Sequence, residues 1–208
     1  KIIVMSQRKG IYRILDIPIL YSFVQKLFEH KSTRLRWHQL IKGYQNGIIL
    51  DIGCGPGNQS IHFKNSKLYI GLDISQIYIN EAKQLYGSFG KFYTMSAIEI
   101  DKLPYSDIDL VLLNGVFHHL SDEQVKEILE KVSKKLSKNG VLVTIDPTFV
   151  KGRVFANFIV SKDRGMHVRK PSSLMAITEK YLKTIDCDVI KQKFPPYQRL
   201  MLKLGSIV

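Results

Sequence analysis

The stretch from residue 48 to residue 58, IILDIGCGPGN, constrains the fold of this chain more than any other. Its apolar residues are typical of a strand buried in a parallel sheet. Asp51 ends the run, and three alternate glycines follow it, Gly53, Gly55 and Gly57. Such glycines let the main chain turn with positive φ and let a ligand lie against backbone N–H groups at a helix start. The stretch therefore predicts a strand, a tight turn and a helix that together bind a ligand.

A dinucleotide-binding turn is the first alternative at this position. That fingerprint needs Gly-x-Gly-x-x-Gly, and its third glycine would fall on Asn58. An acid beside the glycines would also repel a pyrophosphate, whereas it suits an ammonium group. The pattern therefore favours a ligand with a zwitterionic end.

Further apolar segments follow the glycine turn at the spacing of alternating strands and helices. They lie at residues 68–73, 91–95, 107–115 and 141–146. Five such strands predict an α/β protein with a parallel sheet. The tail differs, because a helix is expected over 171–183, followed by strands near 187–192 and 199–204.

Asp73 ends the second expected strand, 22 residues beyond Asp51. An acid at this strand end of a doubly wound sheet accepts hydrogen bonds from the two ribose hydroxyls of an adenosine cofactor. The alternative is that Asp73 caps the next helix, but Ser75 is better placed for that cap. The same helix is expected to bury Ile74, Tyr78, Ala82 and Leu85. A later helix begins with a capping box formed by Ser121 and Gln124.

Residues 45–146 resemble the class I S-adenosylmethionine (SAM) dependent methyltransferases, in particular the small type 11/type 25 enzymes. The likeness rests on the glycine motif, Asp73, Leu103-Pro104, the run VFHHL at 116–120, and residues 140–146. It implies SAM as cofactor and methyl transfer as the activity. It also implies a doubly wound, mostly parallel, seven-stranded Rossmann-like sheet with an antiparallel last strand and helices on both faces. The cofactor-binding residues implied are Asp51, Gly53, Cys54, Gly55, Gly57, Asp73, Ile74, Ser96, Ala97, Ile98, Asn114 and Val116.

One position departs from the family pattern. The third strand is usually followed by Asp-Ala, whose acid accepts from the adenine amino group, and here the pair is Ser96-Ala97. A hydroxyl can accept the same bond, but a neutral hydrogen bond is about half as strong as a charge-assisted one. Ala97 and Ile98 would add backbone contacts and an apolar wall.

Candidate catalytic groups follow the fourth and fifth strands. His118 and His119 are candidate general bases, needed only when the acceptor is a hydroxyl or a protonated amine, and a structural role in the loop is the alternative. Asp146 stands where a substrate acid would lie, or it ends the strand before Pro147. Candidate acceptor-binding residues are Tyr12 from the N-terminal flank and the basic group near Asp163, namely His167 and Arg169.

The net charge of +13 is concentrated in the two flanks. Residues 1–45 carry 9 basic and 2 acidic side chains, residues 46–146 carry 10 and 12, and residues 147–208 carry 12 and 4. We expect one domain over 1–208, with a helical N-terminal cap (1–45), a cofactor-binding core (46–146), and a substrate-side insertion with the C-terminal strands (147–208). The basic flanks indicate an anionic acceptor or an anionic surface, and ordinary solvation is the alternative.

Composition limits the compartment and the partners. Cys54 and Cys187 form no disulfide framework and no metal-ligand spacing, which indicates a reducing, cytoplasmic location without a bound metal. No apolar run approaches the length of a membrane span, although the aromatic and basic flank at 19–41 allows peripheral membrane contact. Three functions stay open: a small-molecule, lipid or glycan methyltransferase, an RNA methyltransferase, and a non-catalytic SAM-binding protein.

Overall fold

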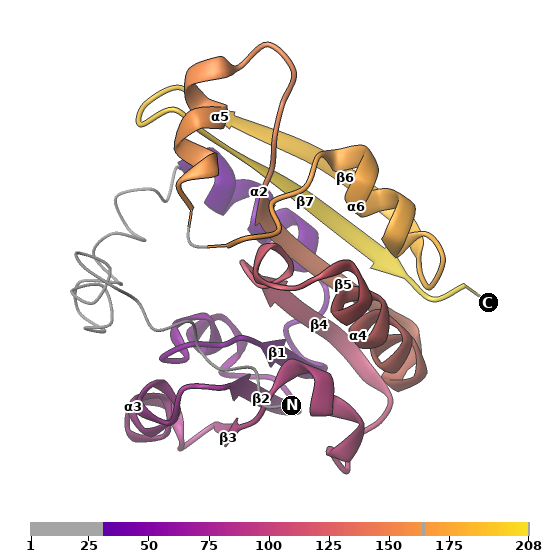
Figure 1. The fold of residues 1–208 in the computed structure, drawn as a ribbon. Helices are drawn as coiled ribbons and strands as arrows, with labels where there is room; N and C mark the ends of the chain where they lie inside the picture. The colour runs from indigo at the N-terminus through magenta and orange to yellow at the C-terminus, as the bar shows by residue number, and fades with distance from the viewer. Residues whose placement is uncertain (1–30, 164, 208) are drawn as a thin grey trace.

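Figure 1 shows the fold as a computed structural model, which describes residues 31–163 and 165–207. Strands and helices alternate along the chain up to the fifth strand, as the sequence predicts. The strands are β1 (Ile48–Ile52), β2 (Leu68–Asp73), β3 (Gly90–Thr94), β4 (Ile108–Asn114), β5 (Leu136–Pro147), β6 (Lys183–Gln192) and β7 (Tyr197–Gly205). The helices are α2 (Lys31–Ile41), α3 (Gln76–Tyr86), α4 (Asp122–Lys135), α5 (Val154–Ser161) and α6 (Pro171–Thr178), with short 3₁₀ helices η2 (Asn58–Phe63), η3 (Ala97–Lys102) and η4 (Phe117–His119).

The seven strands form one sheet in the order β3-β2-β1-β4-β5-β7-β6. The neighbouring strands from β3 across to β5 pair in parallel, whereas β7 pairs antiparallel with both β5 and β6. The predicted doubly wound, mostly parallel sheet with an antiparallel last strand is confirmed. The sheet extends from β1 in both directions, with β2 and β3 on one side and β4 and β5 on the other. In doubly wound sheets, ligands bind at the strand ends next to such a switch in strand order.

Helices cover both faces of the sheet (Figure 1), and a separate apolar cluster fills the space under each layer. Side chains of α4 and α6, including Leu129 and Leu174, pack on one face. Side chains of α2, α3 and η2, including Trp37 and Phe63, pack on the other. The central strands are apolar on both sides because both faces are covered, and each fully buried large side chain contributes about 1.5–3 kcal/mol.

Helix α3 buries a different set of residues from the one predicted. Ser75 is its N-cap, as expected, and its side chain accepts from the backbone N–H of Tyr78. However, Ile79 and Ala82 are the buried residues, while Ile74 and Leu85 are more than half exposed. The stripe that faces the sheet is set by where the helix docks, and it is displaced by about one residue from the expected stripe. The capping box of Ser121 and Gln124 at the start of α4 is present.

Residues 148–170, which we call the β5–α6 insertion, leave the end of β5 and return beside it. Thr148 and Arg169 form a parallel bridge at the base of this insertion, and the Thr148 hydroxyl donates to the Arg169 carbonyl at 2.8 Å. The insertion contains α5. The helix predicted over 171–183 ends earlier, at Thr178, because β6 already begins at Lys183.

No helix in the part of the chain that the structure describes is both long enough and apolar enough to cross a membrane.

Candidate functional site

The glycine turn after β1 has the backbone that its sequence requires. Gly53, Gly55 and Gly57 have φ of 77°, 54° and 82°, values that residues with a side chain rarely adopt. A Cβ added at Gly53 would lie 2.6 Å from Val116 Cγ2, so the loop after β4 packs against the turn. A Cβ added at Gly55 would meet no atom within 4 Å. The main chain at Gly55 therefore borders open space in which a ligand could lie.

Asp73 lies against this turn from the end of β2. One carboxylate oxygen accepts from the backbone N–H of Gly55 at 3.0 Å, and the other accepts from that of Ser75 at 2.8 Å. Burial raises the pKa of Asp73, and these backbone hydrogen bonds lower it. Each carboxylate oxygen has two lone pairs, so the group keeps capacity for hydroxyl donors. Its place fits the predicted ribose contact, which stays a prediction.

Asp51 is enclosed rather than presented to a ligand. Only 1 % of its surface is exposed, and its carboxylate accepts from the Tyr69 hydroxyl at 2.5 Å. Burial raises the pKa of Asp51 to about 7, although the hydrogen bond from Tyr69 lowers it. Cys54 is buried beside the turn, and burial likewise raises the pKa of its thiol. The Asp51 carboxylate contacts Tyr69 within the core, and its predicted contact with an ammonium group stays a prediction.

The residues predicted to surround adenine lie at the end of β3 and in η3. Ser96 caps η3 in a capping box with Glu99, whose carboxylate accepts from the Ser96 backbone N–H at 3.4 Å. Ala97 and Ile98 pack partly against the apolar core, and the Ile98 carbonyl accepts from Lys131. Ile74 is 59 % exposed at the end of β2. These positions stay predictions for the adenine contact.

Asn114 ends β4, the strand beside β1. Its amide oxygen and nitrogen are both buried, and within the described residues neither has a hydrogen-bond partner. Buried polar atoms in proteins are nearly always paired, because an unpaired one costs about 1–3 kcal/mol. The next residue, Gly115, has φ of 71° and leads the chain to Val116. An unpaired amide at this strand end is suited to a polar ligand, so the residues present fit a cofactor there.

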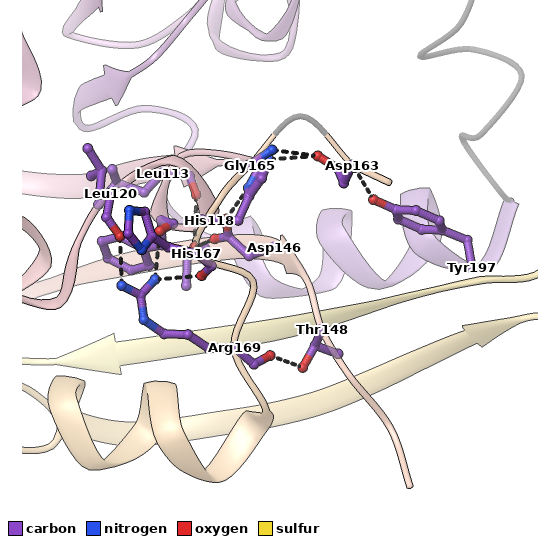
Figure 2. A network of polar contacts seen from close by, with 12 residues as sticks. Leu113, His118, Leu120, Asp146, Thr148, Asp163, Gly165, His167, Arg169 and Tyr197 are labelled. Atoms are coloured by element: carbon purple, nitrogen blue, oxygen red, sulfur yellow. Dashed lines mark hydrogen bonds and ion pairs between the residues drawn. The ribbon is translucent and has the colours of Figure 1, made fainter. Parts of the chain in front are cut away.

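Figure 2 shows the polar network that follows Asn114, centred on His118 of η4. The Nδ1 atom of His118 lies 2.8 Å from the Asp146 carboxylate, and its Nε2 atom lies 3.2 Å from Asp163. Asp163 in turn accepts from the Tyr197 hydroxyl at 2.5 Å. His118 is buried, so this ring connects η4, the end of β5, the β5–α6 insertion and β7.

The two carboxylates determine the charge of this ring. Burial lowers the pKa of His118, but the hydrogen bonds to Asp146 and Asp163 more than offset it and raise that pKa to about 9. Burial raises the pKa of Asp163, and the bonds from His118 and Tyr197 reverse this and hold it well below its usual range. His118 is therefore an imidazolium at neutral pH, with both N–H groups donated to carboxylates. Both ring nitrogens face carboxylates in this structure, and the role of His118 as a general base stays a prediction.

Asp146 is committed to the same network. The oxygen that faces His118 Nδ1 also accepts from the His118 backbone N–H at 3.1 Å, and the other oxygen accepts from the Thr144 hydroxyl at 2.6 Å. The carboxylate is 4 % exposed. The contacts present hold His118, and the role of Asp146 as a substrate acid stays a prediction. His119 is exposed, with its ring centroid 4.0 Å from that of His118, and its role as a base stays a prediction.

Arg169 holds the chain around η4. Its guanidinium donates to the carbonyls of Phe117 and Leu120, each at 2.7 Å, to the carbonyl of His167 at 3.0 Å, and to the Asp122 carboxylate. These bonds occupy the donors of Arg169 in this structure, and its predicted contact with an acceptor stays a prediction. His167 donates its backbone N–H to the His118 carbonyl at 2.9 Å and lies in the same network. Tyr12 lies outside the described residues.

Three members of the network were missed as site residues: Thr144, Asp163 as a partner of His118, and Tyr197. Tyr197 and Asp163 are separated by 34 residues, and Asp163 and His118 by 45. No local spacing signals such pairs, because they meet only when the β5–α6 insertion folds back over the sheet edge. The paired histidines, Asp146 and the basic group near Asp163 were the sequence signals that a site lay there.

Known proteins match this chain over its core. A family model described as a methyltransferase domain matches residues 49–140. The mRNA cap guanine-N(7) methyltransferase of Schizosaccharomyces pombe is 32% identical over 114 residues, 48% of this chain and 32% of that protein. An uncharacterized methyltransferase of a Geobacillus species is 27% identical over 122 residues, 58% of this chain and 57% of that protein. The chain thus spans about a third of the length of the first relative and somewhat over half of the length of the second.

Solved structures share the fold at lower identity. The N-methyltransferase NodS of Bradyrhizobium japonicum, in complex with S-adenosyl-L-homocysteine, superimposes with a TM-score of 0.67 and 16% identity, covering 88% of this chain and 91% of that chain. The chain is thus similar to methyltransferases over residues 49–140, and it shares the fold of an N-methyltransferase solved with S-adenosyl-L-homocysteine.

Proposed function

We propose that the chain transfers a methyl group from SAM to a negatively charged acceptor of the small-molecule, lipid or glycan class. The observation that carries this proposal is the buried, unpartnered amide of Asn114, next to a glycine turn that borders open space at Gly55. Because the described residues supply no hydrogen-bond partner for this amide, we expect a ligand to supply one. This edge of a doubly wound sheet is where that ligand would lie.

Each part of the cofactor has candidate partners in the chain. The main chain of the glycine turn would hold the amino-acid end, Asp73 the ribose hydroxyls, and Ser96 with Ala97 and Ile98 the adenine. Asn114 and Val116 would lie beside the sulfonium. SAM supplies a methyl group that a nucleophile takes in an in-line displacement.

The chain's own contribution is then to orient the acceptor and exclude water. The β5–α6 insertion is fixed beside the end of β4 by the His118 and Arg169 contacts, and this supports a substrate side built from that insertion. His119 is the proposed base for a hydroxyl or protonated amine acceptor, because His118 is already protonated. The basic flank at 147–208, with 12 basic and 4 acidic side chains, supports an anionic acceptor.

Calorimetric titration with SAM tests the cofactor site. Asn114→Ala should weaken binding by on the order of tenfold, since a hydrogen bond contributes about 0.5–1.5 kcal/mol. Asn65→Ala, at an exposed asparagine after η2, is the matched control and should bind SAM normally. Equal affinity in both variants would remove Asn114 from the site.

Radiolabelled SAM and fractionated cell extract test the acceptor. Label should enter an anionic small-molecule, lipid or glycan fraction and survive ribonuclease treatment. His119→Ala should lower that rate above about pH 7, where a neutral imidazole acts as a base. Full activity of the variant would remove His119 as the base, and SAM binding without transfer to any fraction would favour a non-catalytic protein.

RNA methylation is the second candidate, favoured by the basic flanks and by the name of the fission yeast relative, which acts on an mRNA cap. It predicts label in the RNA fraction and RNA binding that weakens steeply with added salt. Absence of both results would leave the first candidate.

A further inference from the structure

Four large apolar side chains are exposed where α5 lies beside the turn between β6 and β7 (Figure 1). Three belong to α5 and one to the turn, and their exposed fractions are 81 % for Val154, 67 % for Phe155, 59 % for Phe158 and 87 % for Phe194. We call these four residues the α5 patch. Contiguous exposed apolar side chains of this size mark a binding surface more often than chance.

The patch is held outward by the way α5 is anchored. The inner side of this helix is buried through Ala156 and Val160. Arg153 donates to the Gln192 carbonyl at 2.7 Å, and Gln198 donates to the Asn157 side chain at 2.7 Å. These two bonds tie the N-cap and the middle of the helix to the strands on either side of the turn that carries Phe194. The helix therefore cannot turn to bury its outer residues without breaking them.

The two segments that carry the patch are basic. Residues 147–162 and 189–199 contain no acidic residue. They carry six basic residues, namely Lys151, Arg153, Lys162, Lys191, Lys193 and Arg199. Lys162 also lies 5.4 Å from the centre of the Phe158 ring, so a cation and an aromatic group share one surface.

We propose that the α5 patch docks on an anionic lipid surface. Its aromatic and aliphatic side chains would enter the boundary between headgroups and acyl chains, while the surrounding lysines meet the lipid phosphates. Charge complementarity over the whole surface therefore favours a membrane.

The position of the patch relates it to the site. Helix α5 ends at Ser161, two residues before Asp163, which contacts His118 at the end of β4. A surface that holds α5 would thus lie near the edge where the cofactor is proposed to bind. A methyl acceptor carried by the membrane is an inference that rests on the proposed function. Lipid binding by the α5 patch does not rest on it.

Vesicle flotation of the full chain tests the proposal without any cofactor. The protein should float with vesicles of phosphatidylcholine mixed with phosphatidylglycerol, remain below with phosphatidylcholine alone, and be released by salt. Phe155→Ser combined with Phe158→Ser should lower the partition coefficient by on the order of tenfold or more. Lys151→Glu combined with Lys193→Glu should lower it to a similar degree.

Matched controls lie on α3 and in the segment between η2 and β2. Ile77→Ser with Leu85→Ser removes apolar side chains that are 67 % and 54 % exposed on α3, and Lys64→Glu with Lys67→Glu reverses two exposed lysines. Both pairs should bind vesicles like the unchanged protein, and circular dichroism should show that every variant is folded.

Three results would overturn the proposal: no flotation, equal flotation with neutral vesicles, or flotation that survives the phenylalanine changes. A dimer in sedimentation velocity that the phenylalanine changes dissociate would instead assign the patch to a second copy of the chain. SAM titration of the same samples separates the two proposals. Vesicle binding without SAM binding would refute the proposed function and leave the docking surface standing.

Discussion

Nε2 of His118 lies 3.2 Å from Oδ1 of Asp163, and this contact joins the loop after β4 to the insertion that follows β5. The other ring nitrogen faces Asp146, so one imidazolium is shared by two carboxylates (Figure 2). The positive charge of His118 offsets the repulsion between Asp146 and Asp163. It thereby holds the β5–α6 insertion beside the sheet edge where the cofactor is proposed to bind. The charge of His118 should therefore make the stability of the fold depend on pH.

Stability should fall as pH rises through the pKa of His118. That pKa is about 9 in the folded chain and 6.5 for an ordinary histidine. A raised folded pKa means that the contribution is fully present below about pH 6.5 and is lost as pH rises through about 9. At about 1.36 kcal/mol per pKa unit, the full effect is about 3 kcal/mol. Urea unfolding at a series of pH values measures it.

The control for this prediction is His118→Gln, whose unfolding free energy should lack that slope above about pH 6.5. The substitution should also cost about 3–5 kcal/mol at neutral pH, because it leaves two buried acids uncompensated. If the variant is too unstable to measure, nitrogen NMR of the imidazole in the unchanged protein decides. An imidazole that titrates near its ordinary pKa would refute the assignment of His118 as an imidazolium shared by Asp146 and Asp163.

Gly55→Ala should abolish SAM binding at a small cost in stability. Gly55 has φ of 54° and open space beside it, so a methyl group meets no protein atom but occupies the proposed ligand space. The backbone strain should cost about 1–2 kcal/mol. Gly43→Ala is the matched control, because Gly43 also has positive φ and no atom within 4 Å, in the turn before β1. If calorimetry shows equal SAM binding by both variants, the ligand does not lie at Gly55.

Asp73→Ala should weaken SAM binding by about 2 kcal/mol, since hydrogen bonds to charged groups contribute about 1.5–3 kcal/mol. Asp73→Asn can still accept from the Gly55 N–H, so it separates loss of the ribose contact from loss of the turn. Ser75→Ala removes the cap of α3, at about 1 kcal/mol of stability, and leaves the carboxylate in place. Unchanged affinity in Asp73→Ala, measured by calorimetry, would exclude the ribose contact.

Arg169→Lys should destabilise the fold by about 2–3 kcal/mol, because a lysine cannot reproduce the planar fork that reaches three carbonyls. Asp122→Asn is the control and should cost less than about 1 kcal/mol, since that carboxylate is 55 % exposed. Thermal and urea unfolding measure both. Unchanged stability with a raised KM for the acceptor would restore Arg169 to substrate binding.

The sequence alone determined the sheet and the place of the cofactor edge. The glycine turn could be predicted because only glycine tolerates the φ values at residues 53, 55 and 57, so the residue types report the backbone directly. The caps formed by Ser75 and by Ser121 with Gln124 could also be predicted, because a cap is a contact between residues three positions apart in the sequence.

Only the tertiary structure decided the roles of the charged groups. Asp51, Asp146, His118 and Arg169 each looked available for a ligand, and each is used by another part of the chain. Apart from Thr144 beside Asp146 and His167 beside Arg169, their partners lie 18 to 52 residues away. Such pairs depend on how the insertion and the strands pack. Burial then fixes their protonation, because a charge removed from water must be shared with whatever the fold places beside it. Local spacing carries no record of that neighbour.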